Sequence, residues 1–189
     1  MKHESDDARL VRRVLAKEPR ASAELVETYR VLVYNFAYQQ LQRRDDAEDV
    51  TQETFVKVFT NLPRYKENAK LSTWILTITQ NLIIDMGRKY RRHRELEERE
   101  KGGGLEWMTK GCPEQPYQDL EAEWQRKILA AAMQKLPEKH RQILQMRDYS
   151  ELEYDQIAEI LNTSANAAKV NVFRARKALR EIVEEMTGE

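Results

Sequence analysis

Four acidic residues close together could in principle hold a divalent cation: Asp45, Asp46, Glu48 and Asp49. Carboxylates with Mg²⁺ are the chemistry of many nucleases. A helix repeats every 3.6 residues, so these four side chains fall on different helical faces. The sequence around them contains neither a phosphate-binding loop nor a nucleophile–base pair. We therefore disfavour an enzyme, and the scattered histidines and the single Cys112 give no recognisable metal site, so we expect no metal and no cofactor.

Basic residues near the end of the chain have a spacing suited to DNA binding. Residues 154–161 have the apolar pattern of a short helix, residues 162–164 form a tight connection, and a second helical pattern begins at Ala165. That second pattern contains basic residues and no acid before position 181: Lys169, Arg174, Arg176, Lys177 and Arg180. Two helices joined by a short turn, the second one basic, are typical of a helix-turn-helix. Ser164 is a suitable cap for the second helix. A solvated face is the competing interpretation.

Aromatic residues beside positive charge form a second candidate. Residues 62–71 are a polar connection containing Tyr65, and Ser72 is expected to cap a helix that contains Trp74. This helix ends in an arginine-rich tail, residues 88–94. Single-stranded nucleic acid stacks its bases on rings while Arg and Lys contact its phosphates. The segment could therefore bind unpaired DNA, although core packing is the simpler explanation for a single tryptophan in a helix.

One acidic helical face contains an apolar residue that does not suit it. Residues 47–61 have a helical pattern, which Asp45 or Asp46 is expected to cap. The side opposite its apolar stripe presents Val56 among polar residues: Glu48, Asp49, Gln52, Glu53 and Lys57. An acidic patch with one exposed apolar side chain is a candidate docking surface for a basic partner. A solvated face is again the alternative.

The elements that must position these groups are all expected to be helices. The 189 residues are 34% charged with only 6 Gly and 5 Pro, and no strand pattern of any strength occurs, which predicts an all-α fold. Further helical patterns cover residues 6–17 and the stretch from Ser22, its expected cap, to position 41. Glycines at 102–104 and two prolines mark residues 96–123 as a flexible linker. We predict two small helical domains, 1–95 and 124–189.

Charge and hydropathy restrict the partners. The formal net charge is zero, which argues against tight DNA binding through bulk electrostatics alone. The sequence has no apolar run of membrane-spanning length and no signal-peptide core near its start. We therefore expect a cytoplasmic protein without membrane insertion that reaches DNA with the help of a partner.

Four stretches together resemble the extracytoplasmic-function (ECF) type of bacterial RNA polymerase sigma factor, in the sigma-70 family. Residues 46–59 resemble region 2.2, residues 71–85 with the arginine tail resemble regions 2.3 and 2.4, residues 136–144 resemble the start of region 4, and residues 154–178 resemble region 4.2. The resemblance implies a non-enzymatic promoter-specificity subunit that binds core RNA polymerase and directs initiation at −35/−10 promoters. Sigma region 2 would occupy 1–95 and sigma region 4 would occupy 124–189. It also implies control by stress or envelope signals through an anti-sigma factor.

The same resemblance assigns roles to individual residues. The core polymerase would be bound at its β′ clamp helices, with region 4 meeting the β flap, and the clamp-binding residues would be Asp49, Gln52, Glu53 and Val56. The residues expected at the −10 element are Arg64, Tyr65, Lys66, Asn68, Ser72, Trp74, Asn81, Arg88 and Arg91. The residues expected at the −35 element are Ser164, Asn166, Lys169, Val170, Phe173, Arg174, Arg176 and Lys177.

Departures from the family pattern concern the −35 element. The family usually has Gly-Thr near Asn166 and Ala167, polar or basic residues at Val170 and Asn171, and a Ser cap where Glu153 stands. The helix-turn-helix is still expected, but its base preference is not predicted. A stand-alone helix-turn-helix regulator remains the alternative function. It would require a dimer interface for palindromic sites, and the sequence shows neither a heptad stretch nor an effector domain.

Overall fold

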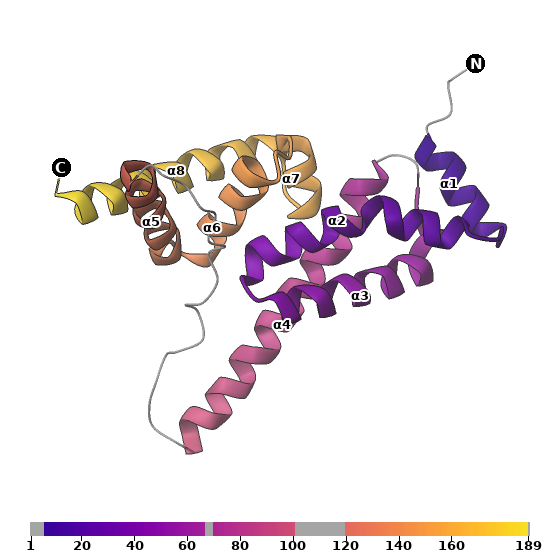
Figure 1. Cartoon of the computed structure of the whole chain (residues 1–189), viewed down its shortest axis with the longest axis horizontal. Helices are drawn as coiled ribbons and strands as arrows, with labels where there is room; N and C mark the ends of the chain where they lie inside the picture. The colour runs from indigo at the N-terminus through magenta and orange to yellow at the C-terminus, as the bar shows by residue number, and fades with distance from the viewer. Residues whose placement is uncertain (1–5, 67–69, 101–119, 189) are drawn as a thin grey trace. The chain divides into compact units, whose positions relative to one another are not determined.

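The computed structural model describes residues 6–66, 70–100 and 120–188, without the side chains of 90–100 and 120–123. Every regular element in these ranges is a helix (Figure 1). Backbone contacts divide the chain into two compact units, Met1–Lys110 and Gly111–Glu189. The predicted all-α fold with two helical domains is therefore confirmed. None of the described helices is long and apolar enough to cross a membrane, and the described side chains form no group of three or more His, Cys, Asp or Glu residues suited to a metal ion.

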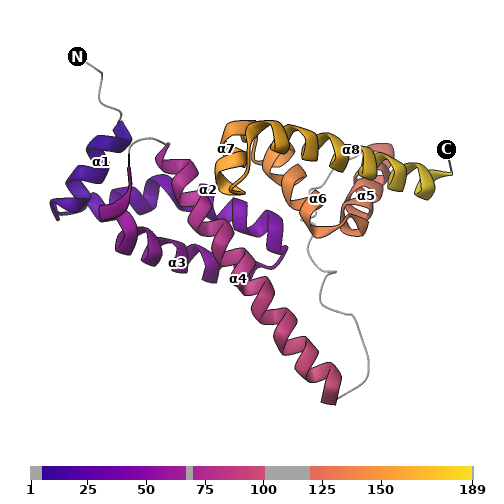
Figure 2. The same ribbon diagram turned by 180° about the vertical axis from the view of Figure 1, so that it is seen from behind.

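The first unit is built from α2 (Ala21–Leu41), α3 (Arg44–Asn61) and α4 (Leu71–Glu100), which pack against one another (Figure 2). Helix α1 (Asp6–Leu15) packs on α2 and on the 3-10 turn η1 (Leu62–Arg64). Apolar residues at three- and four-residue steps give each helix one buried face. Those faces meet in a core made of Leu10, Val11, Leu25, Tyr29, Val33, Phe55, Val58, Leu62, Leu71 and Ile75.

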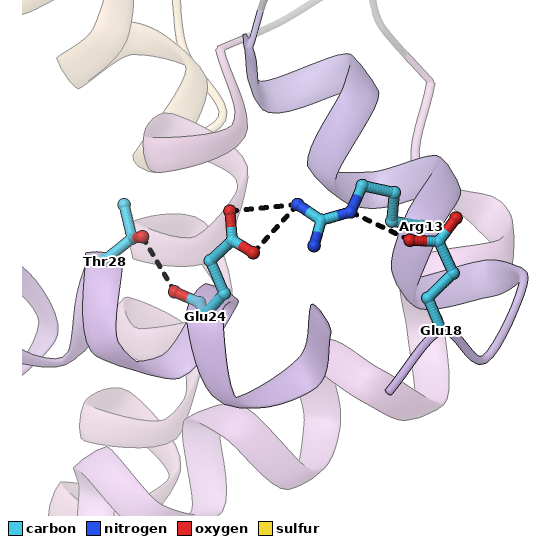
Figure 3. A network of polar contacts seen from close by, with 4 residues as sticks. All are labelled: Arg13, Glu18, Glu24 and Thr28. Atoms are coloured by element: carbon cyan, nitrogen blue, oxygen red, sulfur yellow. Dashed lines mark hydrogen bonds and ion pairs between the residues drawn. The ribbon is translucent and has the colours of Figure 1, made fainter. Parts of the chain in front are cut away.

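Arg13 near the end of α1 bonds to one acid in the turn that follows and to another in the first turn of α2 (Figure 3). Arg13 Nε donates to Glu18 Oε2 at 3.0 Å, and Arg13 Nη1 donates to Glu24 Oε1 at 3.0 Å. The hydrogen bonds to Glu18 and then to Glu24 raise the pKa of the Arg13 guanidinium. Thr28 donates its hydroxyl to the Glu24 carbonyl oxygen at 2.7 Å. This network links the end of α1 to the turn and to the first turn of α2.

Three predicted caps are wrong, because the helices begin before the polar residues that were expected to cap them. Helix α2 begins one residue before Ser22. Asp45 and Asp46 lie inside the first turn of α3, and Ser72 is the second residue of α4. The two aspartates still favour the helix, because negative charge near a helix N-terminus opposes the positive end of its dipole.

The second unit surrounds its longest helix, α8 (Ala165–Thr187). Helices α5 (Leu120–Lys135), α6 (Glu138–Leu144) and α7 (Tyr154–Ile160) each pack on α8. In both views α5 lies near the C-terminal half of α8, whereas α7 lies near its start (Figures 1 and 2). The start of α8 is therefore the part held by the preceding short helices.

The predicted helix-turn-helix is present as α7 followed by α8. Ser164 Oγ accepts a hydrogen bond from the Ala167 N–H at 3.2 Å, which confirms it as the cap of α8. Glu153 also has a partner, since Gln156 Oε1 accepts from its N–H at 3.0 Å. The two helices pack together and bury small and branched residues: Ile157, Ala158, Ala168, Val172 and Ala175.

Helix α6 continues into a π-helical turn, η2 (Gln145–Tyr149), which the sequence analysis did not predict. Such turns carry wider hydrogen-bonded rings than an α-helix and often occur at functional sites. Between η2 and α7 the chain passes through Glu151, whose φ is 52°. A residue with a Cβ is disfavoured in this left-handed region. A π-helical turn and a residue with positive φ therefore precede the first helix of the helix-turn-helix.

Both helices that flank the predicted linker extend into it. Helix α4 ends at Glu100 and α5 begins at Leu120, whereas the linker was expected to cover 96–123. Cys112 lies outside the described residues. The domain and linker boundaries stay predictions.

Candidate nucleic-acid and protein interfaces

The four residues predicted to bind core polymerase lie on one face of α3. Each of Asp49, Gln52, Glu53 and Val56 lies three or four residues from another member of the set, and all four are exposed. Val56 is 65% exposed, although it is a large apolar side chain. Lys57 Nζ lies 3.7 Å from Glu53 Oε1 at the edge of this face. We call the four residues the α3 face; it is an acidic surface with one exposed apolar side chain at its C-terminal end.

The opposite side of α3 is packed into the core of the first unit, which supports the α3 face. Val50 and Val58 on the opposite side of the helix are buried, and Thr54 is fully buried between them. The Thr54 hydroxyl donates to the Val50 carbonyl at 2.7 Å and lies 3.4 Å from the Thr79 hydroxyl of α4. The exposed residues are therefore fixed in their spacing before any partner arrives.

The two aromatic residues predicted at the −10 element lie together. The rings of Tyr65 and Trp74 are 5.2 Å apart, centroid to centroid, with 52° between their planes. Both are half-buried and pack against the core of the first unit. The structure thus supports core packing for Trp74, with one part of each ring still accessible. Arg64 and Lys66 beside them are exposed, and Asn68 lies outside the described residues.

Further along α4, the predicted −10 residues follow one line on the helix surface. Trp74, Asn81 and Arg88 are spaced by seven residues, which keeps them on nearly the same face. Asn81 and Arg88 are exposed, and Arg88 Nη1 lies 3.5 Å from Asp85 Oδ1. Ser72 is half-buried at the start of the helix. The side chain of Arg91 is outside the described set.

A buried amide pair that the sequence analysis missed lies beside this line. Gln40 Nε2 of α2 donates to Gln80 Oε1 at 2.8 Å, and Gln80 is fully buried immediately before Asn81. Gln80 Nε2 and Gln40 Oε1 make no hydrogen bond within the described structure. The hydrogen bond links α4 to α2 immediately before Asn81. A polar residue within a buried stripe is the sequence signal that could have found it.

Helix α8 presents its predicted −35 residues outward. Phe173 is 71% exposed, and Lys169, Val170 and Arg174 around it are exposed as well. Asn166 and Lys177 are exposed above and below, and Lys177 Nζ lies 3.7 Å from Glu181 Oε1. Ser164 is exposed at the cap of the helix. An apolar ring flanked by cations suits a DNA groove better than it suits bare solvent.

Arg176 differs from Lys177 because its partner lies outside α8, on η2. Its Nη2 donates to Asp148 Oδ1, and its Nε donates to Asp148 Oδ2 at 3.5 Å. The hydrogen bond to Asp148 raises the pKa of the Arg176 guanidinium. Sequence reasoning missed Asp148, since nothing in the local pattern links η2 to a residue on α8.

Comparison with known proteins gives the family. The Sigma-70 region 2 family model matches residues 25–93, and the Sigma-70 region 4 model matches residues 126–179. The ECF RNA polymerase sigma factor SigW of Bacillus subtilis (strain 168) is 32% identical over 181 residues, which are 90% of this chain and 93% of SigW. The chain belongs to the ECF sigma factor family. It is therefore a sigma subunit that directs transcription initiation, and the stand-alone regulator is not favoured.

Other comparisons agree with this ECF sigma factor assignment. The ECF sigma factor SigE of Mycolicibacterium smegmatis is 32% identical over 168 residues, covering 88% of this chain and 63% of that protein. Among solved structures, RpoE in complex with the anti-sigma factor NepR from Bartonella quintana matches with a TM-score of 0.67 at 22% identity, over 88% of this chain and 98% of that chain. CnrH in complex with the cytosolic domain of CnrY matches with a TM-score of 0.68 at 19% identity, over 96% of this chain and 99% of that chain. At these identities the structures show the shared fold.

Proposed function

We propose that this sigma factor docks on the β′ clamp helices of core RNA polymerase through the α3 face. The observation that carries the proposal is the exposure of Val56 on the same helix face as three polar residues, Asp49, Gln52 and Glu53. Burying an exposed valine at an interface gains apolar free energy, and the surrounding carboxylates favour a basic partner. The rigid backing of the face by buried residues lowers the entropy cost of binding.

The chain offers a matched control for this proposal. Val31 on α2 is a valine of the same unit with almost the same exposure, 67% against 65% for Val56. Affinity for purified core polymerase is measured for Val56→Ala and Val31→Ala. We expect Val56→Ala to weaken binding by roughly 1 kcal/mol and Val31→Ala to leave it within about 0.5 kcal/mol. Equal effects from the two valines would argue against the α3 face.

Promoter recognition is divided between the two units in this proposal. The start of α8 would enter the major groove of the −35 element, as recognition helices do. Arg174 and Lys169 there have the chemistry to contact guanine edges or phosphates, and Phe173 has the chemistry to contact a thymine methyl group. Lys177 would contact a phosphate. No catalytic step is assigned to any residue of the chain.

At the −10 element an unpaired base would be held between η1 and α4. Asn81 supplies an amide for its edge, while Arg88 and Arg64 supply positive charge for the backbone. The partly accessible rings of Tyr65 and Trp74 lie at the end of this line. Melted DNA is required, because a base inside a duplex cannot enter such a site.

Runoff transcription with core polymerase on a template pool randomised at both elements tests this division. We expect wild type to select defined −35 and −10 sequences. Phe173→Ala with Lys169→Ala should relax the −35 selection alone, and Asn81→Ala should relax the −10 selection alone. The double variant Asp49→Arg/Glu53→Arg should abolish both, because it prevents docking. Loss of selection at the wrong element would contradict the division.

We further propose that an anti-sigma factor holds the protein inactive in the cytoplasm until a signal arrives. The support is family membership together with the structural neighbour RpoE, which was solved in complex with the anti-sigma factor NepR. A reporter with a selected promoter should be nearly silent in unstressed cells and rise after envelope stress. Full, constant expression under both conditions would contradict this control.

A further inference from the structure

Two successive residues of η2 extend to the two helices of the helix-turn-helix. Asp148 pairs with Arg176 of α8 through a fork of two hydrogen bonds. Arg147 Nη1 donates to the Leu152 carbonyl at 2.9 Å and lies 3.4 Å from Glu153 Oε1, and its guanidinium lies 4.9 Å from the ring centroid of Tyr154. Arg147 therefore holds the start of α7, while Asp148 holds α8.

The place of Arg176 on α8 separates it from the outward residues. Arg176 follows Val172 by four residues, so it lies beside a side chain that is only 1% exposed. Lys177 follows Phe173 by the same step and lies on the exposed side. Arg176 thus lies at the edge where α8 meets η2. Lys177 lies on the exposed side of α8, where it could contact a DNA phosphate.

We propose that Asp148 and Arg176 are positioning residues for −35 recognition, fixing the angle of α8 through their forked ion pair, and that Arg176 does not bind a DNA phosphate. A bidentate Arg–carboxylate pair has a defined geometry as well as attraction, which a single point contact lacks. The pair acts near the middle of α8, so a small rotation there displaces Lys169 and Phe173 in the groove. This inference rests on the proposed −35 role of α8.

The two possible roles of Arg176 give opposite signs for one substitution. If Arg176 bound a phosphate, Asp148 would compete for it, and Asp148→Asn would free the cation and strengthen promoter binding. If the pair positions α8, Asp148→Asn removes half of the fork and weakens binding. The salt dependence of promoter binding also distinguishes the two roles of Arg176. Each lost phosphate contact lowers the magnitude of the slope of log K against log salt by about 0.9, whereas the loss of a positioning contact leaves the slope unchanged.

The experiment measures binding of the holoenzyme to a promoter selected from the randomised pool, over a range of salt concentrations. We expect Asp148→Asn and Arg176→Gln each to weaken binding roughly threefold to fivefold, with the slope unchanged and base selection at −35 relaxed. The double variant should be no weaker than either single variant. Lys177→Gln is the matched control, and it should lower the slope while base selection is kept.

Arg176→Lys is a second test that can be used if the other variants fail to fold. It keeps the positive charge, which a phosphate contact would use, but it loses the planar fork. We expect it to relax −35 selection as Arg176→Gln does, with thermal unfolding close to that of wild type. Stronger binding by Asp148→Asn, or a lowered slope for Arg176→Gln, would overturn the inference. If binding by the wild-type holoenzyme did not depend on the −35 sequence, the proposed −35 role of α8 itself would be contradicted.

Discussion

The ring of Trp74, in the first turn of α4, lies against the ring of Tyr65, which directly follows η1, with 5.2 Å between their centroids. The contact joins the two ends of the segment proposed to hold an unpaired −10 base. Tyr65 N–H also donates to the Leu62 carbonyl at 3.0 Å, which holds the backbone of Tyr65 against η1. The shape of the candidate −10 site therefore depends on an aromatic contact that is itself part of the core.

Substitution of Trp74 tests how far this contact is structural. Trp74→Ala should lower the free energy of unfolding by about 2 kcal/mol, because the ring is half-buried and leaves a cavity. Trp74→Phe keeps an aromatic ring against Tyr65 and should recover most of that loss together with transcription from −10-dependent promoters. Urea unfolding and runoff transcription measure the two effects. A stable Trp74→Phe protein that makes no transcripts would show that the indole itself contacts DNA.

The hydrogen bond between Tyr29 and Asp7 gives a pH prediction. Tyr29 donates its hydroxyl to Asp7 Oδ1 at 2.5 Å, and burial, followed by this bond, raises the pKa of the Tyr29 phenol. A raised pKa means that the contribution to stability is present below the unfolded value of about 10 and is lost as pH rises further. We expect Tyr29→Phe to cost about 1 kcal/mol at pH 7.

Above about pH 10 the wild type should lose stability faster than Tyr29→Phe, so that the two curves converge. Denaturant unfolding at a series of pH values measures this. The other tyrosines are common to both proteins, and their titration cancels in the difference. Parallel curves through the alkaline range would contradict the role assigned to the Tyr29 phenol.

The buried amide pair predicts a non-additive double substitution. Gln80→Leu removes one partner and leaves the Gln40 amide unpaired beside the core, which should cost about 1–3 kcal/mol. Gln40→Leu combined with Gln80→Leu removes both polar groups and should restore much of that loss. Urea unfolding of wild type, Gln40→Leu, Gln80→Leu and the double variant gives the four free energies that the comparison needs. Strict additivity would mean that the two amides do not interact in solution.

The positive φ of Glu151 predicts a stabilising substitution. Glycine adopts φ near 52° without a Cβ penalty, so Glu151→Gly should raise the free energy of unfolding of the second unit by about 0.5–1 kcal/mol. Asn162 has a φ of 49°, and asparagine already tolerates this region, so Asn162→Gly is the control and should change little. A loss of stability in Glu151→Gly, measured by thermal unfolding, would contradict this account.

Helical periodicity accounts for what the sequence predicted well. The exposed Val56 was found because it breaks the pattern of its own helix, and that pattern is local, whereas Phe173 was named from the family resemblance. Ser164 was recognised as a cap because its partner is three residues away. Neighbours on one helix face can be read from spacing alone, so both exposed faces could be outlined without coordinates.

Contacts between distant residues account for what was missed. Asp148 and Arg176 are 28 positions apart, and Gln40 and Gln80 are 40 apart, so no local pattern links them. The wrong cap at Ser72 has a different cause: serine suits both the cap and the first turn, and packing decides which it occupies. The prediction that Arg176 contacts DNA came from the family resemblance, which does not reveal its partner Asp148 on η2.

The π-helical turn η2 makes the helix-turn-helix sensitive to chain length as well as to residue type. Removing one residue from this turn would restore ordinary α-helical spacing and rotate each following side chain by about 100° around the axis. Arg147 and Asp148 would then point away from α7 and α8, although both side chains would still be in the sequence. Related proteins with a one-residue deletion here would need a different attachment for α8, so an alignment gap in this turn marks a change in recognition geometry.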